Sequence, residues 1–404
     1  MAQLRWLGAL LMCCVLPSPA QEASAPASAT GQSAAPARTP PIALIPRSHE
    51  ERENRYQDAH RVLLNVLVTD ASGRPAPELR PEDFTLLDNG KPQNLASFRT
   101  GKGNAGFAPA RVILMLDTVN NNSRNIANDG KELERFLAHS PERLTYPTSI
   151  AVLSGSGARV GQSSQDRGAL LAELRMFTRN AHAYSCPGES DSDSDLSDTP
   201  HGASSLSDLV TGSQKVQHWT CLNSRFQLSV SALNRFSSEQ MEVPGRVILI
   251  WIGPGWPLLS GHEFRPDSVT IRQNFFDNLV EVSNGLREAQ ITLDDVSVPN
   301  QLRGAERRSD HDNAFINGVP TEDQVTAGSL GLQVLAHQSG GQILTEGGDL
   351  AGEIAKCIAD AESYYVLSFD SPSAAAPGEF HSLQVKVNKP GLTVRTNTAY
   401  YAQP

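Results

Sequence analysis

The stretch that decides the fold is RVILMLDTVNNNSRN, residues 111–125. Residues 112–116 are continuously apolar, which is typical of a strand that is buried on both faces of a parallel sheet. The strand ends at Asp117 and runs into a polar loop. In α/β proteins, loops at the carboxyl ends of the strands are where ligands bind. The stretch therefore raises the question of whether Asp117 belongs to a working ion site or to the remnant of one.

Strands and helices alternate from this stretch onward, and this alternation favours a mainly parallel sheet covered by helices. Apolar runs predict further strands at residues 149–154, 245–253 and 290–298. Amphipathic periodicity predicts helices at residues 128–140, 166–177, 223–240, 268–289, 327–341 and 349–362. We therefore assign an α/β domain to residues 107–363, with an insertion at 186–221.

Both ends of this domain carry β patterns. Before it, residues 62–70 predict a strand, and residues 83–98 predict a hairpin with Asp88-Asn89-Gly90 at its tip. These elements define an N-terminal β module at 55–100, and residues 364–404 form a C-terminal β segment. Domain termini usually lie close together, which favours association of the two segments. The sequence leaves open whether they form one sandwich or two caps.

The first twenty residues, MAQLRWLGALLMCCVLPSPA, have the charge, apolar run and small-residue end of a secretory signal. The apolar run is shorter than the ~20 residues that span a bilayer. A lipid anchor on Cys13 or Cys14 is the alternative, but small residues are missing ahead of them. Residues 21–54 are rich in Ala, Pro and Ser and are expected to be a disordered leader. We expect a secreted or periplasmic protein without a membrane span after cleavage.

Export makes disulfide bonds possible. Cys186 and Cys221 flank a polar segment with too few apolar residues to form its own core, so we expect them to pair. Cys357 falls on the apolar face of the last predicted helix and is expected to be a buried, free thiol.

Composition excludes several functions. The chain of 404 residues has a net charge of −10, so nucleic acid is not an expected partner. The sequence contains no Gly-x-Ser-x-Gly elbow and no phosphate-binding Gly-x-x-x-x-Gly-Lys loop. GKGNAG, residues 101–106, is followed by a strand instead of a helix, and GHEF, residues 261–264, lacks the second histidine of a zinc site. We therefore expect no enzymatic activity.

Several segments in a fixed order carry a family resemblance. They are VLVTDASGRPAPELRPEDFTLLDNGKPQNLASF, RVILMLDTVNN, GRVILIWIGPGWPL, LAHQSGGQIL, AESYYVLSFD and FHSLQVKVNKPGLTVRTNTAYYA. Together they resemble the VWFA-related domain family, best known from acidobacterial exported proteins, over residues 60–402. The resemblance implies a von Willebrand factor A-like (vWA-like, Rossmann-like) α/β core with β segments at both ends and no enzymatic activity.

In metal-binding A domains, an Asp-x-Ser-x-Ser loop, a Thr and a later Asp hold the ion. Here Asp117 stands at the first position, Val119 at the first serine and Asn121 at the second. Ile252 and Gly253 stand where the later Asp is expected, and no Thr counterpart is found. A hard cation depends on the number of anionic oxygens around it, so we expect a vestigial site of Asp117 and Asn121. Bound Mg²⁺, Mn²⁺ or Ca²⁺ is the alternative, and so is a carboxylate that only accepts hydrogen bonds from the loop.

Two other segments are candidates for binding. WIGPGWPLLSG, residues 251–261, places Trp251 and Trp256 around a turn; we expect Trp251 to pack inward, whereas Trp256 is either buried or an interaction anchor. The acidic run at 189–198 lacks the Gly and the final Glu of a calcium loop and is expected to be solvated.

The sequence thus predicts an exported, non-enzymatic protein that binds a protein or surface ligand. The ligand-face candidates are Asp117, Asn120, Asn121 and Trp256. A structural part of a cell-envelope assembly is the alternative function, and a metal-dependent adhesion module or a hydrolase is less well supported by the residues.

Overall fold

The computed structural model describes most of the chain after the expected leader, and all described residues lie within one compact unit, Glu50–Pro404. The described residues are 60–76, 78–100, 110–186, 205–241, 243–255, 269–296, 318–324, 331–344 and 349–403. The expected signal and leader, the loop at 101–106, the acidic run at 189–198, and Trp256 with GHEF lie outside them.

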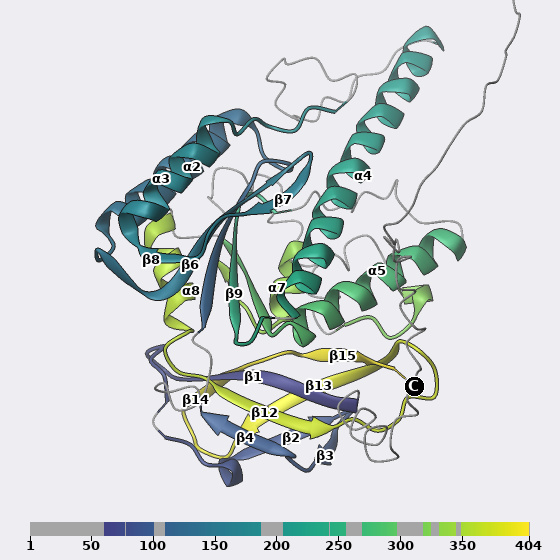
Figure 1. Ribbon diagram of the computed structural model, residues 1–404. Helices are drawn as coiled ribbons and strands as arrows, with labels where there is room; N and C mark the ends of the chain where they lie inside the picture. The colour runs from purple at the N-terminus through teal and green to yellow at the C-terminus, as the bar shows by residue number, and fades with distance from the viewer. Residues whose placement is uncertain are drawn as a thin grey trace, which may run out of the picture. The chain divides into compact units, whose positions relative to one another are not determined.

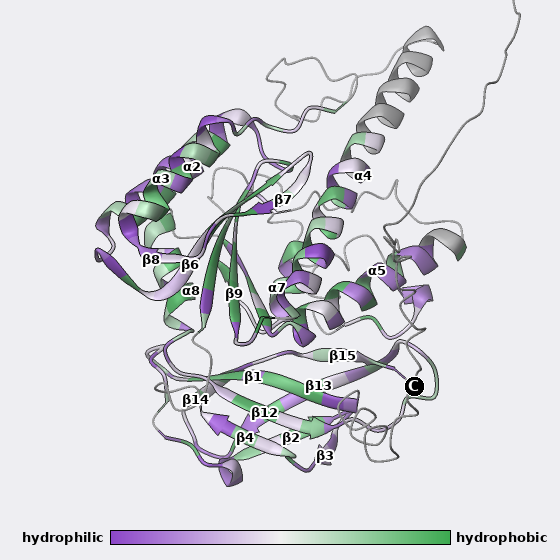
Figure 2. Ribbon diagram, in the orientation of Figure 1, coloured by the Kyte–Doolittle hydropathy of each residue, from purple (hydrophilic) through white to green (hydrophobic). Residues whose placement is uncertain are grey.

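A mainly parallel sheet forms the centre of the α/β part (Figure 1), and its strand order is β11-β10-β9-β5-β6-β7. Its strands are β5 (Arg111–Asp117), β6 (Arg143–Ser154), β7 (Gly157–Val160), β9 (Val247–Ile252), β10 (Ile291–Val296) and β11 (Ile343–Leu344), and β8 (Ser164–Asp166) pairs with β6. Strands β5 and β9 are buried along almost their whole length, and the central strands are largely green in Figure 2. The apolar runs of the sequence predicted this double burial.

Helices cover both faces of this sheet. One face packs against α2 (Ser123–His139), α3 (Arg167–Arg179) and α8 (Leu350–Ala359), and the other against α4 (Ser205–Met241), α5 (Val269–Glu288) and α7 (Leu332–Gln338). Alternate residues of β5 supply the two cores, because successive strand side chains point to opposite faces. Met115 packs with the α4 side and Leu116 with the α2 side. The class is therefore α/β with helices on both faces.

Strands from both ends of the chain build two further sheets. The first has the order β14-β1-β12-β4 and the second β15-β13-β2-β3. Their bounds are β1 (Arg61–Asp70), β2 (Phe84–Asp88), β3 (Lys91–Gln93), β4 (Ser97–Thr100), β12 (Tyr365–Asp370), β13 (Glu379–Val387), β14 (Leu392–Arg395) and β15 (Ala399–Ala402); short 3-10 turns occur at Pro81–Asp83 and Glu322–Gln324. One apolar core joins the two sheets, so N-terminal and C-terminal segments share a single β sandwich.

Specific contacts join the sandwich to the carboxyl end of α8 and to α5. Arg395 of β14 donates through Nη2 to both carboxylate oxygens of Asp360, at 2.8 and 2.7 Å. The Asn284 side chain of α5 donates to the Tyr401 carbonyl and accepts from the Tyr401 amide, at 2.7 and 3.2 Å. These contacts are buried or half-buried, so the sandwich is fixed to the α/β part by directional bonds as well as by apolar packing.

Two elements differ from the sequence prediction. The helix expected at residues 223–240 is α4, which begins at Ser205 and so includes the second half of the cysteine-bounded insertion. Strand β6 is followed by β7, which turns back antiparallel through a hairpin before the next helix. The hairpin expected at residues 83–98 is confirmed for β2 and β3, with Asn89 and Gly90 at positive φ.

Candidate functional site

Asp117 lies at the carboxyl end of β5 and is fully buried. Its Oδ1 accepts hydrogen bonds from the amides of Val119 and Asn120, at 2.9 and 3.0 Å. Its Oδ2 accepts from Asn120 Nδ2 and from the indole N–H of Trp251, at 2.7 and 3.0 Å. Burial raises the pKa of this carboxyl, and the four hydrogen bonds oppose part of that rise. Each oxygen therefore already receives two donors from the protein itself.

The neighbouring strand leaves no room for a second acidic side chain beside Asp117. Gly253 follows β9, and a Cβ atom added to it would lie 2.9 Å from Asp117 Cβ. Trp251 of the same strand is fully buried, as expected, and its N–H fills the position beside Oδ2. Gly253, one of the two residues at the position of the expected acid, thus has no side chain, and the Trp251 indole already donates to Asp117.

The polar loop after Asp117 is turned into the protein. Asn121 is 4% exposed, and its Nδ2 donates to Asp129 Oδ2 of α2 at 2.9 Å. Its carbonyl oxygen, the group a cation would need, accepts from the Asn122 amide at 3.0 Å. Asn120 Nδ2 also donates to Ser229 of α4 at 2.9 Å. The side-chain amides of Asn120 and Asn121 thus link the loop after β5 to α4 on one face of the sheet and to α2 on the other.

A strap, residues 180–186, crosses this loop after α3. The Tyr184 amide donates to the Thr118 carbonyl at 3.0 Å, and Arg225 of α4 donates to the Tyr184 carbonyl at 3.2 Å. Cys186 ends the strap and forms a disulfide with Cys221 of α4, as the sequence predicted. The strap is therefore fixed on one side to the β5 loop and on the other to α4.

Sequence reasoning missed two buried carboxylates, Asp294 and Asp295 of β10. Burial raises the pKa of each to about 7, and for Asp295 the Asp117 charge contributes further. Asp294 Oδ1 accepts from the Gln342 amide at 2.7 Å. The signal was present as an acidic pair inside the otherwise apolar strand ITLDDV. Asp295 is in register with Trp251, so it lies on the Asp117 side of the sheet.

Asp117 and Asn121 do not fit a divalent metal ion. A hard cation requires carboxylate oxygens with free lone pairs, and those of Asp117 and the carbonyl of Asn121 are occupied by protein donors. Within the part of the chain that the structure describes, no three His, Cys, Asp or Glu side chains are grouped to hold a metal ion. The geometry matches the structural interpretation of Asp117, in which the carboxylate organises its own loop.

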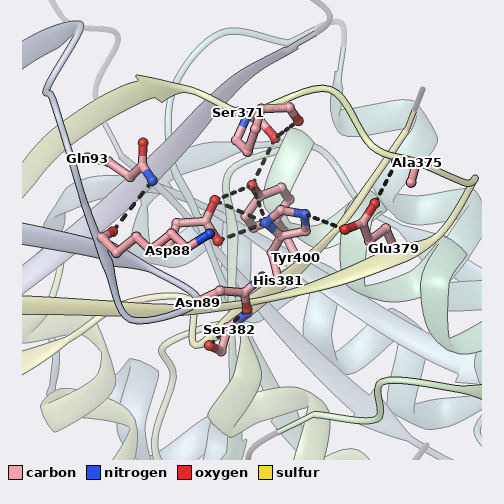
Figure 3. A network of polar contacts seen from close by, with 11 residues as sticks. Asp88, Asn89, Gln93, Ser371, Ala375, Glu379, His381, Ser382 and Tyr400 are labelled. Atoms are coloured by element: carbon pink, nitrogen blue, oxygen red, sulfur yellow. Dashed lines mark hydrogen bonds and ion pairs between the residues drawn. The ribbon is translucent and has the colours of Figure 1, made fainter.

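A second polar network lies inside the sandwich and joins β2, β13 and β15 (Figure 3). Asp88 accepts from His381 Nδ1 at 2.8 Å and from the Tyr400 hydroxyl at 2.9 Å. Burial raises the pKa of the Tyr400 phenol above its ordinary range. The Ser371 hydroxyl contacts Tyr400, at 2.8 Å, and the Pro372 carbonyl. No bond joins Ser371 to the imidazole in this network, so it is not arranged as a serine–histidine catalytic pair.

The remaining predicted residues have clear positions where the structure describes them. Cys357 is fully buried and free, as expected, and burial raises the pKa of its thiol. Trp256 lies outside the described residues, so its exposure stays a prediction. Among the described helices, none is long and apolar enough to cross a membrane.

Comparisons with known proteins give no family assignment. No family model matches the chain, and no curated protein matches it. The chain aligns with the human COPII-coat protein Sec24c at 9% identity, over 76% of this chain and 46% of that one, with a TM-score of 0.30. It aligns with the manganese-loaded TRAP protein of Plasmodium vivax at 7% identity, over 78% and 97%, with a TM-score of 0.32. Proximal thread matrix protein 1 of the mussel byssus aligns at 9% identity, over 73% and 50%, with a TM-score of 0.29. At these TM-scores the matches do not establish a shared fold.

Proposed function

We propose that this protein is an exported, non-enzymatic binding protein whose vWA-like α/β domain recognises a protein or surface ligand without a divalent metal ion. The single observation that carries the proposal is the saturation of the Asp117 carboxylate by four protein donors. Recognition then depends on the shape and charge of the loop face, which is the end of the sheet around residues 117–125, because the carboxylate of Asp117 is not free to complete an ion site.

The disulfide supports export. A disulfide between strap and helix persists in oxidising compartments and is rare in the reducing cytosol. The Cys186–Cys221 bond agrees with the signal-like first twenty residues. The proposed location is therefore the periplasm or the cell exterior.

A structural role in a cell-envelope assembly is the second candidate. The observation that favours it is the burial of the β5 loop, because Thr118, Val119 and Asn121 are each at most 4% exposed. In that case the partner contacts lie on the sandwich, and the loop face serves only the stability of the fold.

The metal question is tested by calorimetric titration of the mature protein with Mg²⁺, Mn²⁺ and Ca²⁺, beside an Asp117→Ala variant. We expect no saturable heat from either protein. Saturable binding by the wild type that is lost in the variant contradicts the proposal, because it requires the Asp117 oxygens to exchange their protein donors for a metal.

The binding face is tested by capture of envelope proteins from the producing organism on the immobilised protein, with and without EDTA. Arg124 is exposed at the first turn of α2, where a glutamate suits the helix dipole. We expect Arg124→Glu to abolish a capture that EDTA leaves unchanged. Lys386→Glu, on an exposed position of β13, is the matched control. Loss of capture in Lys386→Glu alone favours the envelope-assembly role.

A further inference from the structure

We propose that the strap at residues 180–186 is a redox-controlled cover over the β5 loop, held closed by the Cys186–Cys221 disulfide and released when a dithiol reduces it. The inference concerns access to the loop face. Only its consequence for ligand binding rests on the proposed function.

The first observation is the position of the strap. The Tyr184 amide donates to the Thr118 carbonyl at 3.0 Å, directly after the residue that ends β5. The Tyr184 ring packs toward Gly155, so close that a Cβ atom on Gly155 would lie 2.9 Å from it. The ring also joins the core on the α4 side of the sheet. The strap therefore touches the loops after two neighbouring strands, β5 and β6.

The second observation is the burial of the loop that the strap contacts at Thr118. Thr118, Val119 and Asn121 are 1%, 0% and 4% exposed, although they belong to a polar loop at the ligand-binding end of an α/β sheet. Loops at this edge normally lie at the surface. Movement of the strap would remove the Tyr184 contact and give solvent access to the Thr118 carbonyl.

The third observation is the way the strap is anchored. Cys186, the last residue of the strap, forms a disulfide with Cys221 of α4, 35 positions further along the chain. Arg225, one turn later on α4, donates to the Tyr184 carbonyl at 3.2 Å. The covalent bond thus keeps Tyr184 within reach of both Arg225 and Thr118, and its loss leaves only non-covalent contacts between the strap and α4.

A dithiol can reduce the Cys186–Cys221 disulfide in two exchange steps. A thiolate of the dithiol attacks one sulfur of the Cys186–Cys221 bond and forms a mixed disulfide, and the second thiol of the reductant resolves it. The reductant leaves as a disulfide, two electrons and two protons are transferred, and Cys186 and Cys221 become free thiols. Each cysteine is 5% exposed, so we expect attack to follow local opening of the strap.

Hydrogen–deuterium exchange of the oxidised and dithiothreitol-reduced protein tests the proposal. On reduction we expect at least about tenfold faster exchange at the amide of Tyr184, which bonds Thr118, and at those of Val119 and Asn120, which bond Asp117. The amides of β9 are expected to keep their protection, which shows that the fold remains intact. Equal exchange of the Tyr184, Val119 and Asn120 amides in the two forms overturns the proposal.

Two variants make the result specific. Cys186→Ser/Cys221→Ser is expected to exchange like the reduced wild type and to be insensitive to dithiothreitol. Cys357→Ala removes the buried free thiol of α8 and is expected to respond to dithiothreitol like the wild type. If β9 loses protection in the double variant, the comparison is decided by the wild type in its two redox states. Metal titration is independent of this experiment. Unchanged hydrogen exchange on reduction contradicts the redox-controlled cover, whereas saturable metal binding contradicts the proposed function.

Discussion

Replacement of Asp117 by alanine is expected to destabilise the fold strongly, because four donors lose their acceptor at once. The donors are the amides of Val119 and Asn120, Asn120 Nδ2 and the indole N–H of Trp251. A buried donor left without a partner costs about 1–3 kcal/mol. Asn120 is only half-buried, so water can replace part of its loss. Removal of a buried charge also relieves a desolvation cost, and the net loss is expected to be about 3–5 kcal/mol.

Asp117→Asn is the graded control for this prediction. Its single carbonyl oxygen can serve one of the two donor pairs, while its NH₂ group faces the other pair. We therefore expect a smaller loss, about half that of Asp117→Ala. Urea unfolding followed by tryptophan fluorescence measures both free energies of unfolding, and an unchanged m-value confirms that the comparison is valid. An Asp117→Ala variant within about 1 kcal/mol of the wild type would falsify the structural role of this carboxylate.

Three further predictions concern two residues near Asp117 and the junction between the α/β part and the sandwich. Burial raises the pKa of Asp295 to about 7, so folding takes up a proton between pH ~4 and ~7 and the free energy of unfolding falls as pH rises through that range. Asp295→Asn should remove the Asp295 share of this slope and stabilise the protein by a few kcal/mol at pH 8 in urea titrations, while Asp294, with a pKa also of about 7, keeps the remainder; an unchanged slope rejects the assignment. Gly253→Asp should lower stability by about 1–3 kcal/mol and create no Mg²⁺ site in calorimetry, because its Cβ meets Asp117; Mg²⁺ binding would contradict the packing argument. Arg395→Gln should cost about 1–3 kcal/mol through its ion pair with Asp360, and a double-mutant cycle with Asp360→Asn that shows no coupling would refute it.

Elements with strong local signals were predictable. The apolar runs of β5 and β9 predicted strands buried on both faces, and Asn89-Gly90 predicted a tight hairpin turn, because only residues that tolerate positive φ suit that turn. Cys186 and Cys221 were predicted to pair from the polar segment between them. The start of α4 at Ser205 was missed because the polar insertion was expected to lack a core of its own.

The sequence by itself determined the succession of β, α/β and β segments and the absence of an acidic residue at positions 252 and 253, because periodicity and residue identity are local properties. Tertiary structure alone decided where side chains from distant segments meet. It placed the Trp251 indole against Asp117, 134 positions away, and Asp88 of β2 against His381 of β13. It also placed the Tyr184 amide within hydrogen-bond distance of the Thr118 carbonyl. Hydrogen bonds of this kind depend on strand register and helix packing, which the pattern of a single chain does not encode locally.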